Sequence, residues 1–259
     1  MLTVVFVHGF WHGSWCWSPV TEQLTRRGVR SVAVDLDGHG LKSQFPLSRW
    51  ARPFEAAAFA TEPSAVGAVT ATSAAETLIR QLAVIGRGEP CVVAAHSMGG
   101  TVATAAAELA PELFAHLVYV TAFAPVSGQP AGMYIGLPEC AASMVPALHP
   151  ADPAVIGALR IDTGARNLHA AIRETFAVTP ARYGAIPHTY VTCARDNAIP
   201  LELQRRFIKE IDAVSGTPTA VIELDSSHSP FLSQPAALAT VIAELAPIAV
   251  PDGRVQGSR

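Results

Sequence analysis

One serine of the chain stands where a predicted strand runs directly into a predicted helix. The run CVVAAHSMGG begins with β-branched and small apolar residues, reaches Ser97, and continues into small residues that open an alanine-rich segment. On such a sharp turn a serine hydroxyl projects above the sheet, and small neighbours let strand and helix approach closely. Ala95 replaces the first glycine of the usual G-x-S-x-G pattern. We expect Ser97 to be a nucleophile, the alternative being a serine that only caps the helix.

A serine hydroxyl needs a base to take its proton, and the base needs a carboxylate to orient it. Of the nine histidines, His228 fits best, because it lies in the loop DSSHSPFLSQP between the last expected strand and the final helix. For the carboxylate, Asp196 follows a strand in CARDNAIP, and Asp225 lies three residues before His228. We prefer Asp196, since Asp225 can instead brace its loop through backbone hydrogen bonds.

The elements that must position these groups alternate between short apolar runs and longer helix-permitting segments. We expect strands at residues 3–7, 31–36, 91–95, 116–121, 188–193 and 220–224. We expect helices at residues 19–27, 74–85, 99–109, 201–214 and 235–245. This alternation predicts an α/β fold with a mostly parallel sheet of about six strands flanked by helices. The three candidate residues then gather at the C-terminal edge of that sheet.

Two connections are too long to be simple crossovers. Residues 38–72 are rich in proline, alanine and phenylalanine, and residues 123–187 contain helical pieces without a clear strand. Long insertions in compact domains usually form lids or binding loops. We expect a core of residues 1–122 and 188–249, an inserted lid of residues 123–187, and a disordered tail at 250–259.

Composition narrows the classes of function. The net charge of −3 offers no basic stripe for a phosphate backbone, so nucleic-acid binding is not expected. The chain contains no run of about 18 uncharged apolar residues, the length that a membrane-spanning helix would need. The start MLTVVFVHG lacks the features of a secretory signal, and four irregularly spaced cysteines indicate reduced, mostly buried thiols. We expect a cytoplasmic protein with small-molecule partners, and the oligomeric state stays open.

No cofactor or metal is expected. The chain has no P-loop, no dinucleotide fingerprint and no zinc-finger spacing. His8 and His12 are four residues apart, but a strand followed by a glycine-rich loop does not put them on one face.

The motifs VHGFWHGSWCW, AHSMGG, CARDNAIP and SSHSPFLSQP, in this order, resemble those of the α/β-hydrolases, specifically the branch of plant methylesterases and hydroxynitrile lyases. The resemblance covers residues 1–247, although residues 38–72 and most of the lid match weakly. It implies the α/β-hydrolase fold with an inserted lid and a triad of Ser97, His228 and Asp196. It also implies an oxyanion hole formed by the backbone N–H groups of Phe10 and Met98.

Two departures separate esterases from lyases within this branch. The lyases resemble H-T-I-C-H-G in the first loop and carry a lysine directly after the catalytic histidine, whereas this chain has Gly9 and Ser229. With Gly9 and Ser229 at these positions, the chain lacks the threonine hydroxyl and the lysine ammonium group that support cyanohydrin cleavage in the lyases. The resemblance therefore favours a carboxylic ester hydrolase that acts on a methyl ester or lactone of an apolar molecule through an acyl-enzyme. A lyase, cyclase or acyltransferase on the same fold, or a ligand-binding receptor, stays open.

Apolar residues of the lid and the neighbouring loops are candidates for substrate contact. Segment 123–187 contains methionines and aromatic residues but few charges, which suits an apolar pocket for a bulky acyl group. For each such residue, ordinary packing of the lid on the sheet is the alternative. The candidates are Trp11, Phe123, Met133, Tyr134, Met144 and Phe231.

Overall fold

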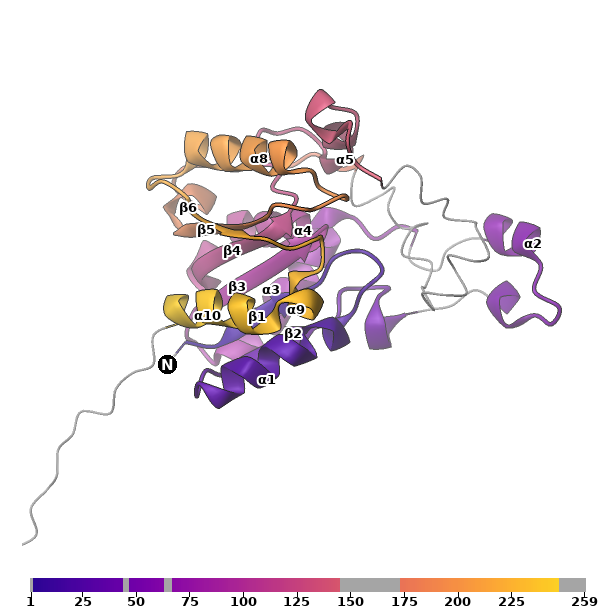
Figure 1. The fold of residues 1–259 in the computed structure, drawn as a ribbon, viewed down its shortest axis with the longest axis horizontal. Coiled ribbons are helices and arrows are strands. Elements are labelled where there is room, and N and C mark those ends of the chain that lie inside the picture. The colour runs from indigo at the N-terminus through magenta and orange to yellow at the C-terminus, as the bar shows by residue number, and fades with distance from the viewer. Residues whose placement is uncertain (1, 44–46, 63–66, 145–172, 247–259) are drawn as a thin grey trace, which may run out of the picture.

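The computed structural model describes residues 2–43, 47–62, 67–144 and 173–246 (Figure 1). Its six strands form one sheet in the order β2-β1-β3-β4-β5-β6, and every neighbouring pair is parallel. The predicted α/β architecture is therefore confirmed. The strands are β1 (Val4–Val7), β2 (Ser31–Val34), β3 (Cys91–Ser97), β4 (Phe114–Ala122), β5 (His188–Cys193) and β6 (Ala220–Leu224).

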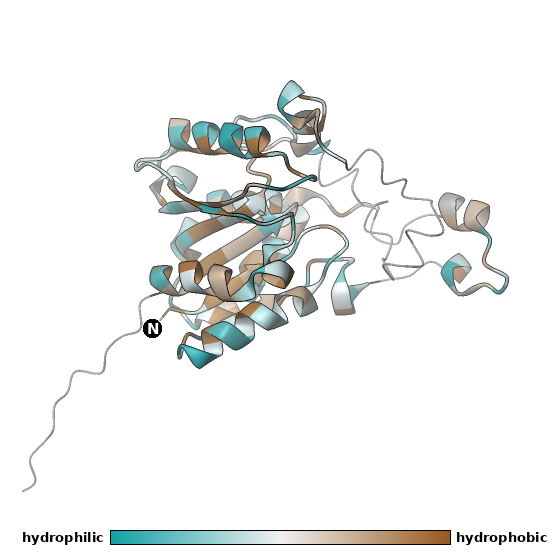
Figure 2. Ribbon diagram, in the orientation of Figure 1, coloured by the Kyte–Doolittle hydropathy of each residue, from teal (hydrophilic) through white to brown (hydrophobic). Residues whose placement is uncertain are grey.

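Helices cover both faces of the sheet, and the strand sequences reflect this. In β1, Val5 and Val7 face one core while Val4 and Phe6 face the other, so the strand is apolar throughout. The first core lies under α3 (Ala71–Gly86), α4 (Gly99–Leu109) and α8 (Leu201–Val214). The second lies under α1 (Ser18–Arg26) and α10 (Pro235–Leu245), which run side by side in Figure 1. Figure 2 shows apolar strands and helices with mixed faces, as this layering requires.

The long helices agree with the sequence prediction to within a few residues. Helices α4, α8 and α10 have the predicted bounds, and α3 begins three residues before its predicted start at residue 74. A capping box explains that earlier start, because Thr70 Oγ1 accepts from the Ser73 N–H at 3.1 Å and Ser73 Oγ accepts from the Thr70 N–H at 2.9 Å. The cap satisfies backbone groups that a helix end otherwise leaves open.

Shorter helices occupy the loops. They are η1 (Ser14–Trp17), η2 (Gly40–Lys42), η3 (Leu47–Trp50), α2 (Ala56–Thr61), η4 (Pro111–Leu113), α5 (Ala131–Ile135), η5 (Pro138–Cys140), η7 (Tyr183–Ala185) and α9 (Pro230–Ser233). Of these, α5, η5 and η7 belong to the predicted lid of residues 123–187. Residues 145–172 of that lid and the predicted tail at 250–259 lie outside the described residues.

The described part of the lid is fastened to the loop that follows β5. Ser143 Oγ donates to the Ala198 carbonyl at 2.8 Å, and the Met144 N–H donates to the Asn197 carbonyl at 2.7 Å. These two bonds hold residues 143 and 144 of the predicted lid beside the loop at the C-terminal edge of the sheet.

Two further expectations concern the chain as a whole. All four cysteines are buried and none forms a disulfide. Within the described ranges, no helix combines the length and the apolar character needed to cross a bilayer.

Candidate active site

Ser97 ends β3 in a backbone conformation that residues with a side chain rarely adopt. Its φ is 51°, in the left-handed region. The chain turns at once into α4, and this close turn requires glycine next to it, because a Cβ on Gly99 would lie 2.4 Å from the His8 carbonyl oxygen. The small residues after the serine therefore let strand and helix meet while the hydroxyl points out of the sheet.

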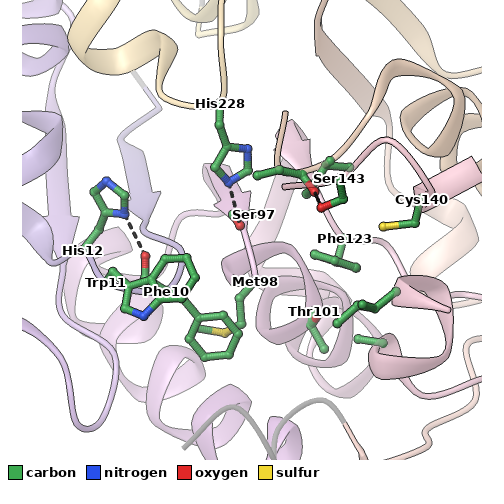
Figure 3. A pocket seen from close by; sticks show the side chains of 14 residues that line it. Phe10, Trp11, His12, Ser97, Met98, Thr101, Phe123, Cys140, Ser143 and His228 are labelled. Carbon is green, nitrogen blue, oxygen red and sulfur yellow. Dashed lines mark hydrogen bonds between the residues drawn. The ribbon is translucent and has the colours of Figure 1, made fainter. Parts of the chain in front are cut away.

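Ser97, His228 and Asp196 form one hydrogen-bonded chain. Ser97 Oγ lies 3.0 Å from His228 Nε2, and His228 Nδ1 lies 2.7 Å from Asp196 Oδ2 (Figure 3 shows the first contact). A carboxylate can only accept, so Nδ1 carries the hydrogen and Nε2 is left to accept the serine proton. The three residues predicted from separate motifs thus lie in the order that general-base activation of a serine requires.

The Asp196 side chain is fully buried and accepts four hydrogen bonds. Oδ1 accepts from the N–H groups of Ala198 at 2.6 Å and Ile199 at 2.9 Å. Oδ2 accepts from His228 and from the hydroxyl of Thr121. A buried carboxylate needs such partners because it has lost its hydration.

The alternative acid, Asp225, lies elsewhere. Its side chain is 76% exposed and forms an ion pair with Arg195 at 2.7 Å. Its carbonyl accepts from the Gln234 side chain at 2.7 Å, so this residue braces the loop, as the alternative interpretation allowed.

His96, the neighbour of the serine, holds the backbone of the histidine loop. Its Nε2 donates to the His228 carbonyl at 2.7 Å, and the two rings lie 4.5 Å apart. Burial, together with the neighbouring His228, keeps the pKa of His96 well below its usual range, so this ring is neutral. It does not line the pocket described below.

The loop after β1 passes very close to the serine. A Cβ on Gly9 would lie 2.5 Å from Ser97 Cβ, so only glycine fits at this position of the loop. Trp11 has a φ of 62°, and His12 Nδ1 donates to the Phe10 carbonyl at 2.8 Å (Figure 3). Phe10 and His12 therefore hold the loop in a curled form beside the hydroxyl. The predicted N–H donors, Phe10 and Met98, both lie at this wall of the pocket.

Ser97 and His228 open into a pocket of about 690 Å³, including its mouth. Among the described residues that line it, none carries a carboxylate, ammonium or guanidinium group. The lining consists of Phe10, Trp11, His12, Ser97, Met98, Thr101, Phe123, Ala131, Ile135, Cys140, Ser143, Ala198, Ile199 and His228 (Figure 3).

Two of the six predicted contact residues, Trp11 and Phe123, line this pocket. Phe231 does not. Its ring is fully buried in the core below the site, 4.9 Å from the ring of Trp17 and 4.8 Å from that of His96. That prediction is corrected: Phe231 supports the histidine cluster from behind and does not face a substrate.

The three lid candidates also lie outside the lining. Tyr134 points to α8, where its hydroxyl donates to Glu210 and its ring packs 4.7 Å from that of Phe207. Met133 and Met144 are 54% and 60% exposed to solvent. Apolar character alone did not distinguish a residue that faces the pocket from one that faces a helix or solvent.

The lining residues that sequence reasoning missed are mostly small or aliphatic. Ala131 and Ile135 are four residues apart on α5 and so share one face of that helix, a spacing that could have identified them as a pair. Ala198 and Ile199 lie two and three residues after Asp196, the predicted acid, a position that also pointed to the site. The remaining missed residues are His12, Thr101, Cys140 and Ser143.

Comparisons with known proteins agree with the fold and the motifs. The sequence profile of the alpha/beta hydrolase family matches residues 4–241. Methylesterase 7 of Arabidopsis thaliana is 27% identical over an alignment of 275 positions, gaps included. The alignment covers 93% of this chain and 95% of that protein. Methyl jasmonate esterase 1 of Vitis vinifera is 25% identical over 277 residues, with 93% and 95% covered.

Among solved structures, polyneuridine aldehyde esterase superposes with a TM-score of 0.69 at 22% identity, over 95% of this chain and 100% of that one. At this identity the superposition shows the fold. The resemblance to the methylesterase branch is confirmed by the sequence relatives. The chain belongs to the alpha/beta hydrolase family.

Proposed function

We propose that this protein is a serine hydrolase that cleaves the carboxylic ester of a neutral, apolar small molecule. The observation that carries the proposal is the hydrogen-bonded chain from Ser97 through His228 to Asp196 at one wall of an apolar pocket. Relatives named methylesterase and methyl jasmonate esterase support ester hydrolysis, and a methyl ester in particular.

In the first half of the reaction, His228 Nε2 takes the hydroxyl proton of Ser97 while the serine oxygen attacks the ester carbonyl carbon. Asp196 stabilises the imidazolium that forms, and the N–H groups of Phe10 and Met98 bind the oxyanion. His228 then gives its proton to the leaving alkoxide, and the alcohol departs from an acylated serine.

In the second half, His228 takes a proton from water as that water attacks the acyl carbon. Collapse of the second oxyanion breaks the bond to Ser97, which regains its proton from His228. The carboxylic acid leaves, and the enzyme returns to its starting state without any cofactor in these steps.

The first loop supports hydrolysis rather than cyanohydrin cleavage. The lyases of this branch carry a threonine where this chain has Gly9, and a Cβ at that position would lie 2.5 Å from Ser97 Cβ. Their lysine is replaced by Ser229, and no described lysine or arginine lines the pocket. A departing cyanide would find no ammonium or guanidinium group among the described residues that line the pocket.

The proposal is tested with two p-nitrophenyl esters of equal chain length, the butyrate and the hemisuccinate. We expect kcat/KM for the neutral butyrate to be about 100-fold higher or more, because the succinyl carboxylate would enter an apolar pocket without a cation to pair with. A fluorophosphonate should inactivate the protein in step with its covalent attachment. Equal rates on both esters would contradict the apolar acyl site, and tight ester binding without turnover would indicate a receptor.

Gly9→Ala tests the loop that holds the Phe10 N–H. The added methyl group must displace either this loop or Ser97, so kcat on p-nitrophenyl butyrate should fall by about 10- to 100-fold, approaching the loss of one oxyanion donor. The matched control is Gly136→Ala, whose Cβ would meet only the Met133 carbonyl oxygen at 3.7 Å. The control should keep the parental kcat. Parental turnover in Gly9→Ala would remove this loop from the oxyanion site.

A further inference from the structure

Thr121 lies at the C-terminal end of β4, the strand between the one that carries the nucleophile and the one that leads to the acid. In the sheet order, β4 separates β3, which ends at Ser97, from β5, which leads to Asp196. The Thr121 side chain is fully buried and is absent from the pocket lining. The mechanism above assigns it no part.

The backbone of Thr121 is strained. Its φ is 37°, in the left-handed region, where a β-branched side chain is a clear outlier. Such conformations persist only where the surrounding structure enforces them, and they cluster at active sites. We therefore expect a contact of the Thr121 side chain to offset the energetic cost of this backbone conformation.

An irregularity of the β3–β4 ladder produces this conformation. His96 pairs with Val120, but the next residue, Ser97, pairs with Ala122, so Thr121 is the extra residue of a bulge. A bulge re-aims the side chain of the residue it contains. The pairing that skips Thr121 lies directly at the nucleophile, and the Phe123 N–H continues it by donating to the Ser97 carbonyl at 3.0 Å.

The re-aimed hydroxyl meets the acid. Thr121 Oγ1 donates to Asp196 Oδ2, the oxygen that also accepts from His228 Nδ1 at 2.7 Å. The other oxygen is held by its own loop, through the N–H groups of Ala198 and Ile199. The carboxylate is thus fixed at one oxygen by its own loop, and at the oxygen facing the histidine by a different strand. Contacts at both oxygens define the plane of the carboxylate.

Few charged side chains lie close enough to stabilise the Asp196 carboxylate in place of this hydroxyl. Among the described residues, the ion-pair partner of Asp196 is His228, while Arg195 pairs with exposed Asp225. Desolvation by burial raises the pKa of the Cys193 thiol on β5 to about 12, so this neighbour carries no charge at neutral pH.

The other titratable groups around the pair are neutral as well. Burial raises the pKa of Tyr190 on β5 well above its usual range, and its hydroxyl donates to the Ala122 carbonyl. Burial lowers the pKa values of His96 and His12, which face His228 from β3 and from the first loop. The hydroxyl of Thr121 is therefore one of few groups that stabilise the buried carboxylate.

We propose that Thr121 is a positioning residue of this site, whose hydroxyl orients the Asp196 carboxylate toward His228. The inference rests on the proposed function, since it assigns Asp196 and His228 to catalysis. A carboxylate with one donor fewer holds a proton more strongly, whether its own or that of the imidazole. Without the Thr121 hydroxyl, His228 should therefore stay protonated, and unable to accept the serine proton, up to a higher pH.

Thr121→Val tests this by removing the hydroxyl while keeping the branched shape. We expect kcat on p-nitrophenyl butyrate to fall by about 10- to 100-fold, the range for a lost hydrogen bond to a charged group, with KM unchanged. The acid limb of the pH profile of kcat/KM should move to higher pH. Thr121→Ser keeps the hydroxyl and should restore both the rate and the profile.

The matched control is Thr192→Val on β5, a buried threonine whose hydroxyl only contacts the Ile222 carbonyl at 3.4 Å. It should leave the pH profile in place. Parental kcat and pH profile in Thr121→Val would overturn the inference, and so would a serine variant as impaired as the valine variant, since that result would assign the effect to packing.

An NMR titration of the isotope-labelled His228 imidazole separates this inference from the proposed function, because it needs no turnover. If Thr121 acts as proposed, the titration midpoint is higher in Thr121→Val than in the parent and in Thr121→Ser. An unchanged midpoint would reject the role of Thr121 even in an active esterase. A raised midpoint in a protein that hydrolyses no ester would reject the function and keep the positioning role.

Discussion

Ser97→Ala is expected to lower kcat on p-nitrophenyl butyrate by about 10⁴-fold or more and to abolish labelling by a fluorophosphonate. The alanine has no oxygen to attack the ester, so the 3.0 Å contact with His228 Nε2 loses its proton donor. The remaining pocket and oxyanion loop can still bind the ester and polarise its carbonyl. Binding of a substrate analogue should therefore persist while turnover disappears.

Ser143→Ala is the matched control for that experiment. Ser143 lines the same pocket, but its hydroxyl donates to the Ala198 carbonyl at 2.8 Å. This variant should keep labelling and most of the turnover. If Ser97→Ala hydrolyses as fast as the parent, Ser97 is not the nucleophile, and loss of labelling in Ser143→Ala instead would transfer that role to the lid.

Asp196→Asn is expected to lower kcat by about 10³- to 10⁴-fold, because an amide in place of the carboxylate no longer holds the histidine in the required tautomer. The amide NH₂ group is a donor and cannot accept from His228 Nδ1. Whichever of the two carboxylate oxygens it replaces, it faces other donors. Those donors are the N–H groups of Ala198 and Ile199 on Oδ1 and the hydroxyl of Thr121 on Oδ2. Either orientation of the amide therefore breaks part of the network.

Asp225→Asn is the paired comparison, since it makes the same chemical change at a carboxylate that does not contact His228 in the structure. Its carboxylate is largely exposed and contacts Arg195, and exposed ion pairs contribute little. We expect kcat within about twofold of the parent, as for most surface substitutions. A larger loss at Asp225 than at Asp196 would move the acid to the residue three positions before the histidine.

The parts of this protein that could be predicted from the sequence are those with strong local signals. β-Branched runs marked the strands, and α4, α8 and α10 have the bounds that periodicity and proline positions predicted. Ser97, Asp196 and His228 could be selected because each lies at or shortly after the C-terminal end of a parallel strand, and these ends lie at one edge of the sheet. Their mutual distances then follow largely from topology.

The pocket could not be predicted in the same way. Tyr134 and Ile135 are adjacent on α5, yet one packs against α8 and the other lines the pocket. Which face of such a short helix meets the site depends on how it sits against α8, and composition carries no such information. Phe231 shows the same limit, since a buried aromatic ring serves a core as well as a cavity.

The sequence by itself determined the fold class, the strand-turn-helix around Ser97 and His228 as the predicted base, and it limited the predicted acid to Asp196 or Asp225, because local patterning and chain order specify these features. Only the tertiary structure decided that Asp196, and not Asp225, contacts the histidine, and which side chains enclose the pocket. It alone revealed the bulge that aims Thr121 at the acid. The physical reason is that side-chain direction and strand register result from packing between distant segments, which no local stretch of sequence encodes.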